Sequence, residues 1–140
     1  MIFSPVCILV GFFSWPPMLT RIFRNLLKKL KDADTKASFY VIGSRVIERP
    51  NILIEEYMSG HEIGVHTWSH AVSYFRLAIV LFALPLLNQS LTSLTNEQIV
   101  AELGWTRRAI RAVLGVTPIT MRPPKGDIGR SAFLLVLWNY

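Results

Sequence analysis

The chain has 140 residues, 51% of them hydrophobic, and a formal net charge of +6. This length allows one domain at most, and the single cysteine, Cys7, excludes an internal disulfide. The positive charge does not indicate a nucleic-acid-binding protein, because the basic residues are dispersed and no known DNA- or RNA-binding motif accompanies them.

The first 17 residues form an apolar segment without a charged residue. Residues 1–13 resemble the hydrophobic part of a secretory signal, but a preceding basic region and a cleavage site of the Ala-x-Ala type are missing. We therefore expect residues 1–17 to be either a signal-like segment or mispredicted sequence, and the domain to begin at residue 18.

An amphipathic helix is predicted from about residue 18 to residue 31. Apolar residues recur there at helical spacing, and the basic residues occupy the opposite, solvated side. A polar turn over residues 32–36 separates this helix from a predicted buried strand at 37–42, which ends at Gly43.

Two short helices and a second strand are expected next. Ser44 is expected to cap the first helix, and Pro50 to open another that covers about residues 51–58 and stops at Gly60. An apolar run around residues 63–65 then predicts a short buried strand. The alternation of helices and strands predicts a parallel α/β arrangement with right-handed crossovers.

A His-x-x-x-His pair, His66 and His70, follows this strand. The carboxyl edge of a parallel sheet is where α/β proteins hold ligands and metals, and imidazole is a common metal ligand near neutral pH. The pair is therefore either two ligands of a divalent metal or two surface histidines beside a core Trp68. His61, which follows a glycine in a turn, is expected to be an exposed loop histidine.

Residues 72–90 interrupt this alternation of elements. An uncharged apolar run at 77–87 contains Pro85, is too short to span a bilayer by itself and is expected to be a core or interfacial segment. Residues 88–90 form an Asn-x-Ser sequon, which has a meaning only in a secreted chain. The sequence therefore predicts an apolar helical insertion at 72–90.

Regular structure is expected to resume at Thr95. Residues 95–98 have the spacing of a helical capping box, and the apolar face that follows continues to Gly115, which is expected to end the helix. Residues 117–121 predict a third strand, which leads into the proline-containing stretch at 122–127.

Three blocks of the sequence, taken in order, resemble one family. They are KASFYVIGSRV at 36–46, GHEIGVHTWSH at 60–70 and LTNEQIVAELGWTRRAIRAVLGVTPITMRPPKGD at 94–127. Together they resemble the polysaccharide deacetylases, also called the NodB-homology family or carbohydrate esterase family 4, and most of all the fungal chitin deacetylases.

The resemblance implies a fold and a reaction. The fold is α/β, a fragment of a distorted (β/α) barrel over residues 18–140 with the insertion at 72–90. The reaction is hydrolysis, in which a divalent metal, zinc or cobalt, helps to remove acetyl groups from chitin or N-acetylglucosamine oligomers. The resemblance also implies a secreted or cell-wall location.

The resemblance also implies roles for single residues. His66 and His70 would be metal ligands, and Thr67 would steady the loop between them. Arg122 would orient the catalytic aspartate, and the backbone N–H of Lys125 would stabilise the oxyanion of the intermediate. Two further residues would contact the substrate, Pro123 and Pro124.

The family's pair of adjacent aspartates is missing from its expected place. One aspartate is a general base and the other is the third metal ligand, and both should precede the helix at 18–31. Residues 10–18 contain no carboxylate, and the first acidic residue of the chain is Asp32. Loss of a general base alone lowers a rate by about 10²–10⁴-fold, so we expect an impaired enzyme.

Other departures concern the substrate groove. Lys125 replaces the aromatic residue that the family prefers after Arg-Pro-Pro, so the backbone donor remains and the sugar-stacking ring is lost. The family's later motifs, with a tryptophan and a general-acid histidine, are expected beyond Asp127. No histidine follows His70, and Trp138 has no matching context.

Two functions of other classes remain open. One is a catalytically inactive carbohydrate-binding or cell-wall-associated protein, and the other is a membrane-attached protein anchored by residues 72–87 or 1–19. Removing residues 72–90 would restore the short connection of the family, which indicates unspliced or mispredicted coding sequence. Trp68 and Trp105 are expected to be packing residues rather than platforms for a sugar.

Overall fold

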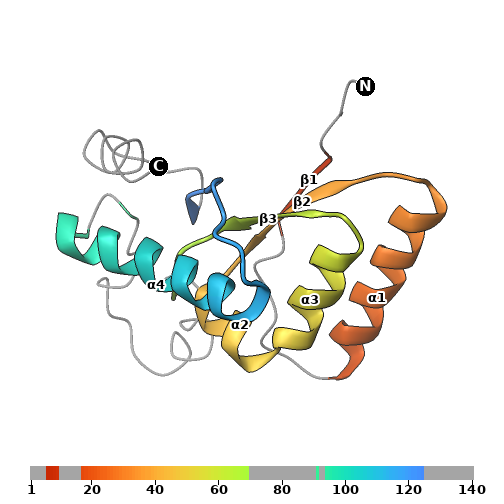
Figure 1. Cartoon of the computed structure of the whole chain (residues 1–140), viewed down its shortest axis with the longest axis horizontal. Helices are drawn as coiled ribbons and strands as arrows, with labels where there is room; N and C mark the ends of the chain where they lie inside the picture. The colour runs from red at the N-terminus through yellow and green to blue at the C-terminus, as the bar shows by residue number, and fades with distance from the viewer. Residues whose placement is uncertain (1–5, 10–16, 70–90, 92–93, 125–140) are drawn as a thin grey trace, which may run out of the picture.

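The computed structural model describes residues 6–9, 17–69, 91 and 94–124. Three parallel strands form a sheet of order β1-β2-β3, namely β1 (Val6–Leu9), β2 (Ala37–Val41) and β3 (Glu62–Val65). The helices are α1 (Pro17–Asp32), α2 (Gly43–Glu48), α3 (Pro50–Met58) and α4 (Asn96–Leu114). All four helices lie on the same side of the sheet (Figure 1). Parallel strands covered by helices on one face form the wall of a (β/α) barrel.

The two long helices lie where the helical periodicity predicts them. At the start of α4, Gln98 N donates to Thr95 Oγ1 (3.4 Å) and Thr95 N donates to Gln98 Oε1 (2.9 Å), so the predicted capping box is confirmed. Gly115 follows the helix with a φ of 76°, a left-handed conformation that glycine adopts without strain.

The strand β1 lies inside the apolar segment at 1–17 and is not among the predicted elements. It pairs in parallel with β2, with Cys7 opposite Ser38. A strand of four residues within a longer apolar run has no periodicity of its own, so pattern analysis cannot distinguish it from its surroundings. Pairing with β2 is what defines it.

The predicted strand at 117–121 is wrong in its extent. The structure contains one parallel bridge, between Val65 and Met121. The N–H of Val65 donates to Thr120 O and the N–H of Arg122 donates to Val65 O, both at 2.9 Å. Pro118 has no backbone N–H and therefore cannot donate to a strand ladder at its position. The bridge nevertheless places Arg122 beside the end of β3.

The predicted cap at Ser44 is also wrong. The residue that precedes α2 is Ile42, and no side chain caps the helix. Instead the N–H groups of Gly43 and Ser44 donate to the carbonyls of Thr67 (3.0 Å) and Trp68 (3.1 Å). The helix start is therefore satisfied by the backbone that follows β3, which a local sequence pattern cannot show.

The core lies between the sheet and the helices. Residues of a strand point alternately to its two faces, and Phe39 and Val65 are 0% exposed. The helices contribute Phe23, Leu27, Leu53 and Ile110 to the same cluster. On the other face of the sheet, Ser38 Oγ (2.6 Å) and Thr120 Oγ1 (3.0 Å) both donate to the carboxylate of Glu62.

A buried carboxyl group in α3 should make the stability depend on pH. Glu56 is 1% exposed, and burial, together with the nearby charge of Glu55, raises its pKa to about 8. The unfolded chain releases this proton near pH 4.5 and the folded chain near pH 8. The stabilisation that comes from protonated Glu56 is therefore complete below pH 4.5. Between pH 4.5 and about 8, the free energy of unfolding should fall by up to roughly 1.4 kcal/mol per pH unit as the pH rises.

Replacing Glu56 by glutamine should remove this part of the pH dependence. The measurement is urea unfolding at several pH values between 4.5 and 8, compared with the unmodified chain. The control is Asp32→Asn, an exposed carboxyl group at the end of α1. Equal slopes for the Glu56→Gln variant and the unmodified chain would contradict the prediction.

The described residues agree with a (β/α) arrangement, and the predicted insertion at 72–90 lies outside them. Among the described helices, none combines the length and the apolar character that are needed to cross a bilayer. The carboxyl ends of β2 and β3 come together near the start of α2 and residues 120–122. This edge holds the candidate site.

Candidate functional site

His66 lies directly after β3 and is 1% exposed. Its N–H donates to Val41 O at 3.0 Å, so the backbone remains paired with the end of β2. Strand pairing therefore fixes the position of this residue at the carboxyl edge of the sheet. In a parallel α/β fold, this edge of the sheet is where side chains that bind ligands are expected.

The ring of His66 makes a hydrogen bond with the backbone of Arg122. His66 Nδ1 lies 2.7 Å from Arg122 O. A carbonyl oxygen only accepts hydrogen bonds, so Nδ1 carries the proton and donates it. In the neutral imidazole this leaves the lone pair on Nε2, which is the tautomer that a metal ligand requires.

The backbone of Arg122 has a role that the sequence does not predict. Its N–H donates to Val65 O (2.9 Å) and its carbonyl accepts from His66 Nδ1, so this residue orients the ring of His66. Its side chain is exposed. The proposed action of that side chain on a catalytic aspartate therefore stays a prediction.

Thr67 has an unusual backbone conformation. Its φ is 64°, and it is 2% exposed. A β-branched residue in the left-handed region costs about 1–3 kcal/mol and persists only where its surroundings hold it. Thr67 Oγ1 has no hydrogen-bond partner among the described residues. The chain therefore makes a sharp, strained turn immediately after His66.

A carboxylate from α4 holds this turn. Glu102 Oε2 accepts hydrogen bonds from the N–H groups of Trp68 (2.8 Å) and Ser69 (2.9 Å), and its Oε1 accepts from Ser69 Oγ (3.0 Å). Glu102 is absent from the predicted site residues. The sequence feature that could have identified it is its position on the buried side of α4, between Ile99 and Thr106, because a buried acidic residue needs a hydrogen-bond partner.

The two tryptophans differ in their surroundings. Trp68 is half-buried against the core, as predicted, and a Cβ atom at Gly43 would lie 2.5 Å from its Cε3. Trp105 is 55% exposed, so its predicted packing role is wrong. The guanidinium of Arg108 lies 5.0 Å from the centre of the Trp105 ring, a cation–π contact on the exposed side of α4.

The prediction that His61 is exposed is wrong. His61 is 5% exposed, and its ring meets Phe39 edge to face with 5.1 Å between the centroids. Its Nδ1 accepts a hydrogen bond from Ala37 N at 3.3 Å. Burial and the neighbouring Lys36 lower the pKa of the imidazole. His61 is thus a neutral packing residue at the opposite end of β3.

The residues present fit a divalent metal only in part. His66 offers the correct tautomer, and Pro123 and Pro124 follow in half-buried and buried positions. The other predicted site residues, His70 and Lys125, lie outside the described residues. Within 6–9, 17–69, 91 and 94–124, no group of three or more histidine, cysteine or acidic side chains is placed to hold an ion.

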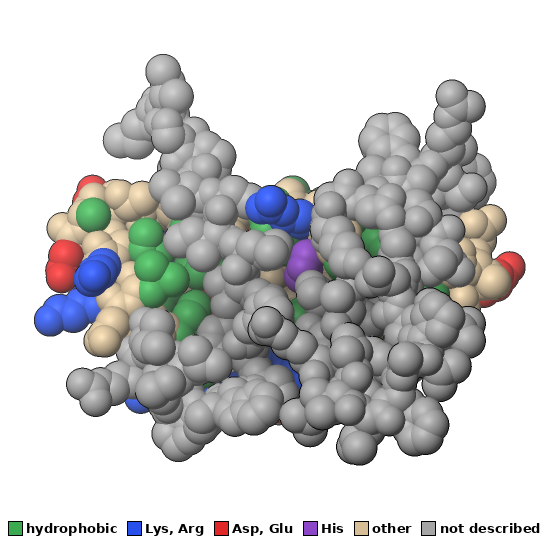
Figure 2. Space-filling model, turned by 180° about the vertical axis from the view of Figure 1, so that it is seen from behind, with side chains coloured by type: hydrophobic (Ala, Val, Ile, Leu, Met, Phe, Trp, Pro, Cys, Tyr) green, Lys and Arg blue, Asp and Glu red, His purple; other side chains and the backbone are tan. Residues whose placement is uncertain are grey.

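Figure 2 shows the molecule from the side opposite to that of Figure 1. A histidine side chain is visible near its middle beside Lys or Arg side chains, and the visible acidic side chains lie at the two ends.

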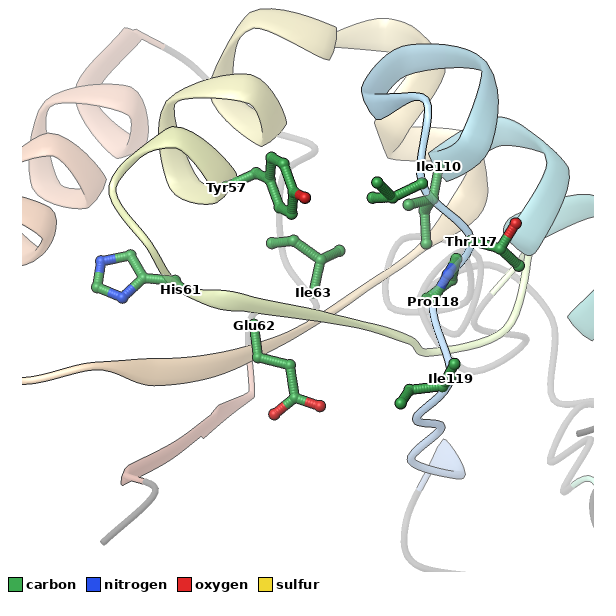
Figure 3. Close-up of a pocket in the computed structure, with 9 residues that line it drawn as sticks. Tyr57, His61, Glu62, Ile63, Ile110, Thr117, Pro118 and Ile119 are labelled. Carbon is green, nitrogen blue, oxygen red and sulfur yellow. The ribbon is translucent and has the colours of Figure 1, made fainter. Parts of the chain in front are cut away.

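A separate hollow lies at the other end of β3 (Figure 3). Its volume is about 200 Å³, and its lining includes Tyr57, Ile63, Ile110 and Pro118. The ring of His61 points away from it in the close-up. The hollow is apolar and begins near residue 61, whereas His66 follows the carboxyl end of the strand. It is therefore distinct from the candidate metal site.

Comparison with known proteins gives a consistent result. The polysaccharide deacetylase model matches residues 12–136. Chitin deacetylase 1 of Cryptococcus neoformans var. grubii serotype A is 50% identical over 103 residues, which are 74% of this chain and 18% of that protein. The chitin deacetylase of Amylomyces rouxii is 31% identical over 118 residues, 79% of this chain and 24% of that protein.

A solved structure is similar as well. Peptidoglycan deacetylase PdaC from Bacillus subtilis is 28% identical and superimposes with a TM-score of 0.67, over 93% of this chain and 54% of that chain. The chain thus spans about a fifth of the length of the two curated relatives and about half of the solved one. With the family model matching most of its length, the chain belongs to the polysaccharide deacetylase family, NodB-homology or carbohydrate esterase family 4, and is similar to the fungal chitin deacetylases.

Proposed function

We propose that this chain provides the histidine ligands of the metal site of a polysaccharide N-deacetylase, and that its hydrolytic activity is impaired. The substrate class is chitin or N-acetylglucosamine oligomers, and the setting is secretion or the cell wall. The observation that carries the proposal is the hydrogen bond of 2.7 Å between His66 Nδ1 and Arg122 O. It leaves the lone pair on His66 Nε2 for a metal.

A bound zinc or cobalt ion would polarise the acetamide carbonyl and acidify a water molecule. His66 Nε2 and the predicted ligand His70 would hold it, with Thr67 shaping the turn between them. The backbone N–H of Lys125 would stabilise negative charge on the substrate oxygen. The substrate would lie against two neighbouring residues, Pro123 and Pro124.

Impairment follows from the missing carboxylates. Residues 10–18, which lead into the first turn of α1, contain no aspartate or glutamate. Asp32 ends α1, and a helix of 16 residues places it about 22 Å from the start of α1. It therefore lies far from the start of α1, which is where the aspartates of the family are expected. Catalytic zinc normally has three protein ligands.

The experiment is to measure acetate release from N-acetylglucosamine oligomers by the purified chain with added zinc. We expect no release above the blank, together with zinc binding that depends on His66. Acetate release above the blank would contradict the impairment. Zinc binding that is equal in the His66→Ala variant would contradict the metal site.

The absence of carboxylates at 10–18 also favours a second candidate, a catalytically inactive carbohydrate-binding protein. Sedimentation with insoluble chitin tests it separately from hydrolysis. Retention on chitin without acetate release supports this candidate, and a chain that stays in the supernatant excludes it.

A further inference from the structure

The backbone N–H and carbonyl groups of the turn at residues 67–69 need hydrogen-bond partners, and the deacetylase resemblance does not say which groups provide them. β2 ends at Val41 and β3 at Val65, so the backbone beyond His66 has no further ladder to join. On one side the turn is held by α2, whose first N–H groups donate to the carbonyls of Thr67 and Trp68. The N–H groups of Trp68 and Ser69, in the turn itself, point toward α4.

The carboxylate of Glu102 is what meets these N–H groups. It accepts hydrogen bonds from the backbone of Trp68 and Ser69 and from the Ser69 hydroxyl, all within 3.0 Å. Hydrogen bonds to an ionised acceptor are about twice as strong as neutral ones. Such bonds can stabilise the left-handed conformation of Thr67, which is unfavourable by itself.

The Glu102 backbone is in turn fixed inside α4. Thr106 Oγ1 donates to Glu102 O at 2.8 Å, and Thr106 is 0% exposed. A Cβ atom at Gly43 would lie 2.6 Å from Thr106 Oγ1, so α2 and α4 approach closely at this point. The carboxylate therefore extends from a rigid helix, and its position does not depend on a loop.

We propose that Glu102 is a positioning residue of the deacetylase site: it fixes the turn that connects the metal ligand His66 to His70. The inference rests on the proposed metal site for its functional part. It assigns Glu102 no contact with substrate or metal. Removing the carboxylate would leave two N–H groups without an acceptor and would let the strained turn relax, so the backbone that leads on from His66 would no longer be held in place.

The test uses the full chain with Glu102→Ala and Glu102→Gln, and zinc affinity measured by competition with a chelating dye. Glu102→Ala should weaken zinc binding about 10–100-fold, the usual effect of removing a group that orients a metal ligand. Glutamine has the same shape, its oxygen can accept from both N–H groups, and its amide can donate to Ser69 Oγ, so Glu102→Gln should stay within about threefold of the unmodified chain. The control is Glu55→Ala on the exposed side of α3.

A second measurement, amide hydrogen exchange in the metal-free chain, separates the two parts of the argument. Glu102→Ala should expose the amides of Trp68 and Ser69 to rapid exchange while the amide of His66, bonded to Val41 O, stays protected. If the unmodified chain and His66→Ala bind zinc equally, the proposed function fails and exchange alone decides whether Glu102 fixes the turn.

Two outcomes overturn the inference. One is zinc affinity of Glu102→Ala within about twofold of the unmodified chain, since an orienting group should contribute at least tenfold. The other is unchanged protection of the Trp68 and Ser69 amides in that variant. Should Glu102→Ala fail to fold, the unmodified chain decides, because rapid exchange of its Trp68 and Ser69 amides would contradict the inference.

Discussion

Replacing His66 by alanine is expected to weaken zinc binding by about 100-fold or more, a larger effect than the loss of a group that only orients a ligand. The reason is that, in the proposed site, His66 would bind the metal through Nε2, and the bond from Nδ1 to Arg122 O places the lone pair on that nitrogen. Affinity can be measured by competition with a chelating dye at constant pH.

The matched control is His61→Ala. Both histidines are buried and lie at the two ends of β3, at 5% and 1% exposure for His61 and His66. Removing His61 takes away the partner of Ala37 N and the edge-to-face contact with Phe39, so it should lower stability and leave zinc affinity within about twofold. Equal losses of affinity in both variants would show that binding depends on folding in general.

Phe39→Ala is expected to lower the free energy of unfolding by about 3–5 kcal/mol, the usual cost of removing a large buried aromatic ring. Phe39 is 0% exposed and lies between Phe23 (5.7 Å between centroids) and His61 (5.1 Å). The ring thus joins α1 to the sheet. The measurement is urea unfolding of the metal-free chain.

Met58→Ala is the control for that experiment. Met58 ends α3 and is 77% exposed, so its removal should change the free energy of unfolding by no more than about 0.5 kcal/mol. A loss below about 1 kcal/mol for Phe39→Ala would contradict the described core, because cavity formation alone costs more than that.

Much of the fold is predictable because its signals are local. The apolar periodicity of α1 and α4, the capping box at Thr95 and the glycine at 115 each act within a few residues. The failures share a different cause. β1, the bridge at Met121 and the backbone cap of α2 are each defined by pairing with distant parts of the chain.

The candidate site shows the same division. His66 is predicted as a ligand from the residue types in one short motif, and the family is predicted from three blocks of sequence in order. The bond from the His66 ring to Arg122 O joins residues 56 positions apart, and Glu102 reaches the turn at 68–69 across 33 and 34 positions. Neither contact involves a pattern of residue types, because in each case one partner is a backbone group. Exposure of Trp105 and burial of His61 likewise depend on tertiary packing.

The central claim is that Nε2 of His66 is presented to a metal by a carbonyl that holds Nδ1–H. The most direct measurement is ¹⁵N NMR of the imidazole in the full chain, with and without zinc. The account predicts a protonated Nδ1 in both states and a shift of the Nε2 resonance when zinc is added. A proton on Nε2 in the zinc-free chain, with no change on adding zinc, would contradict it.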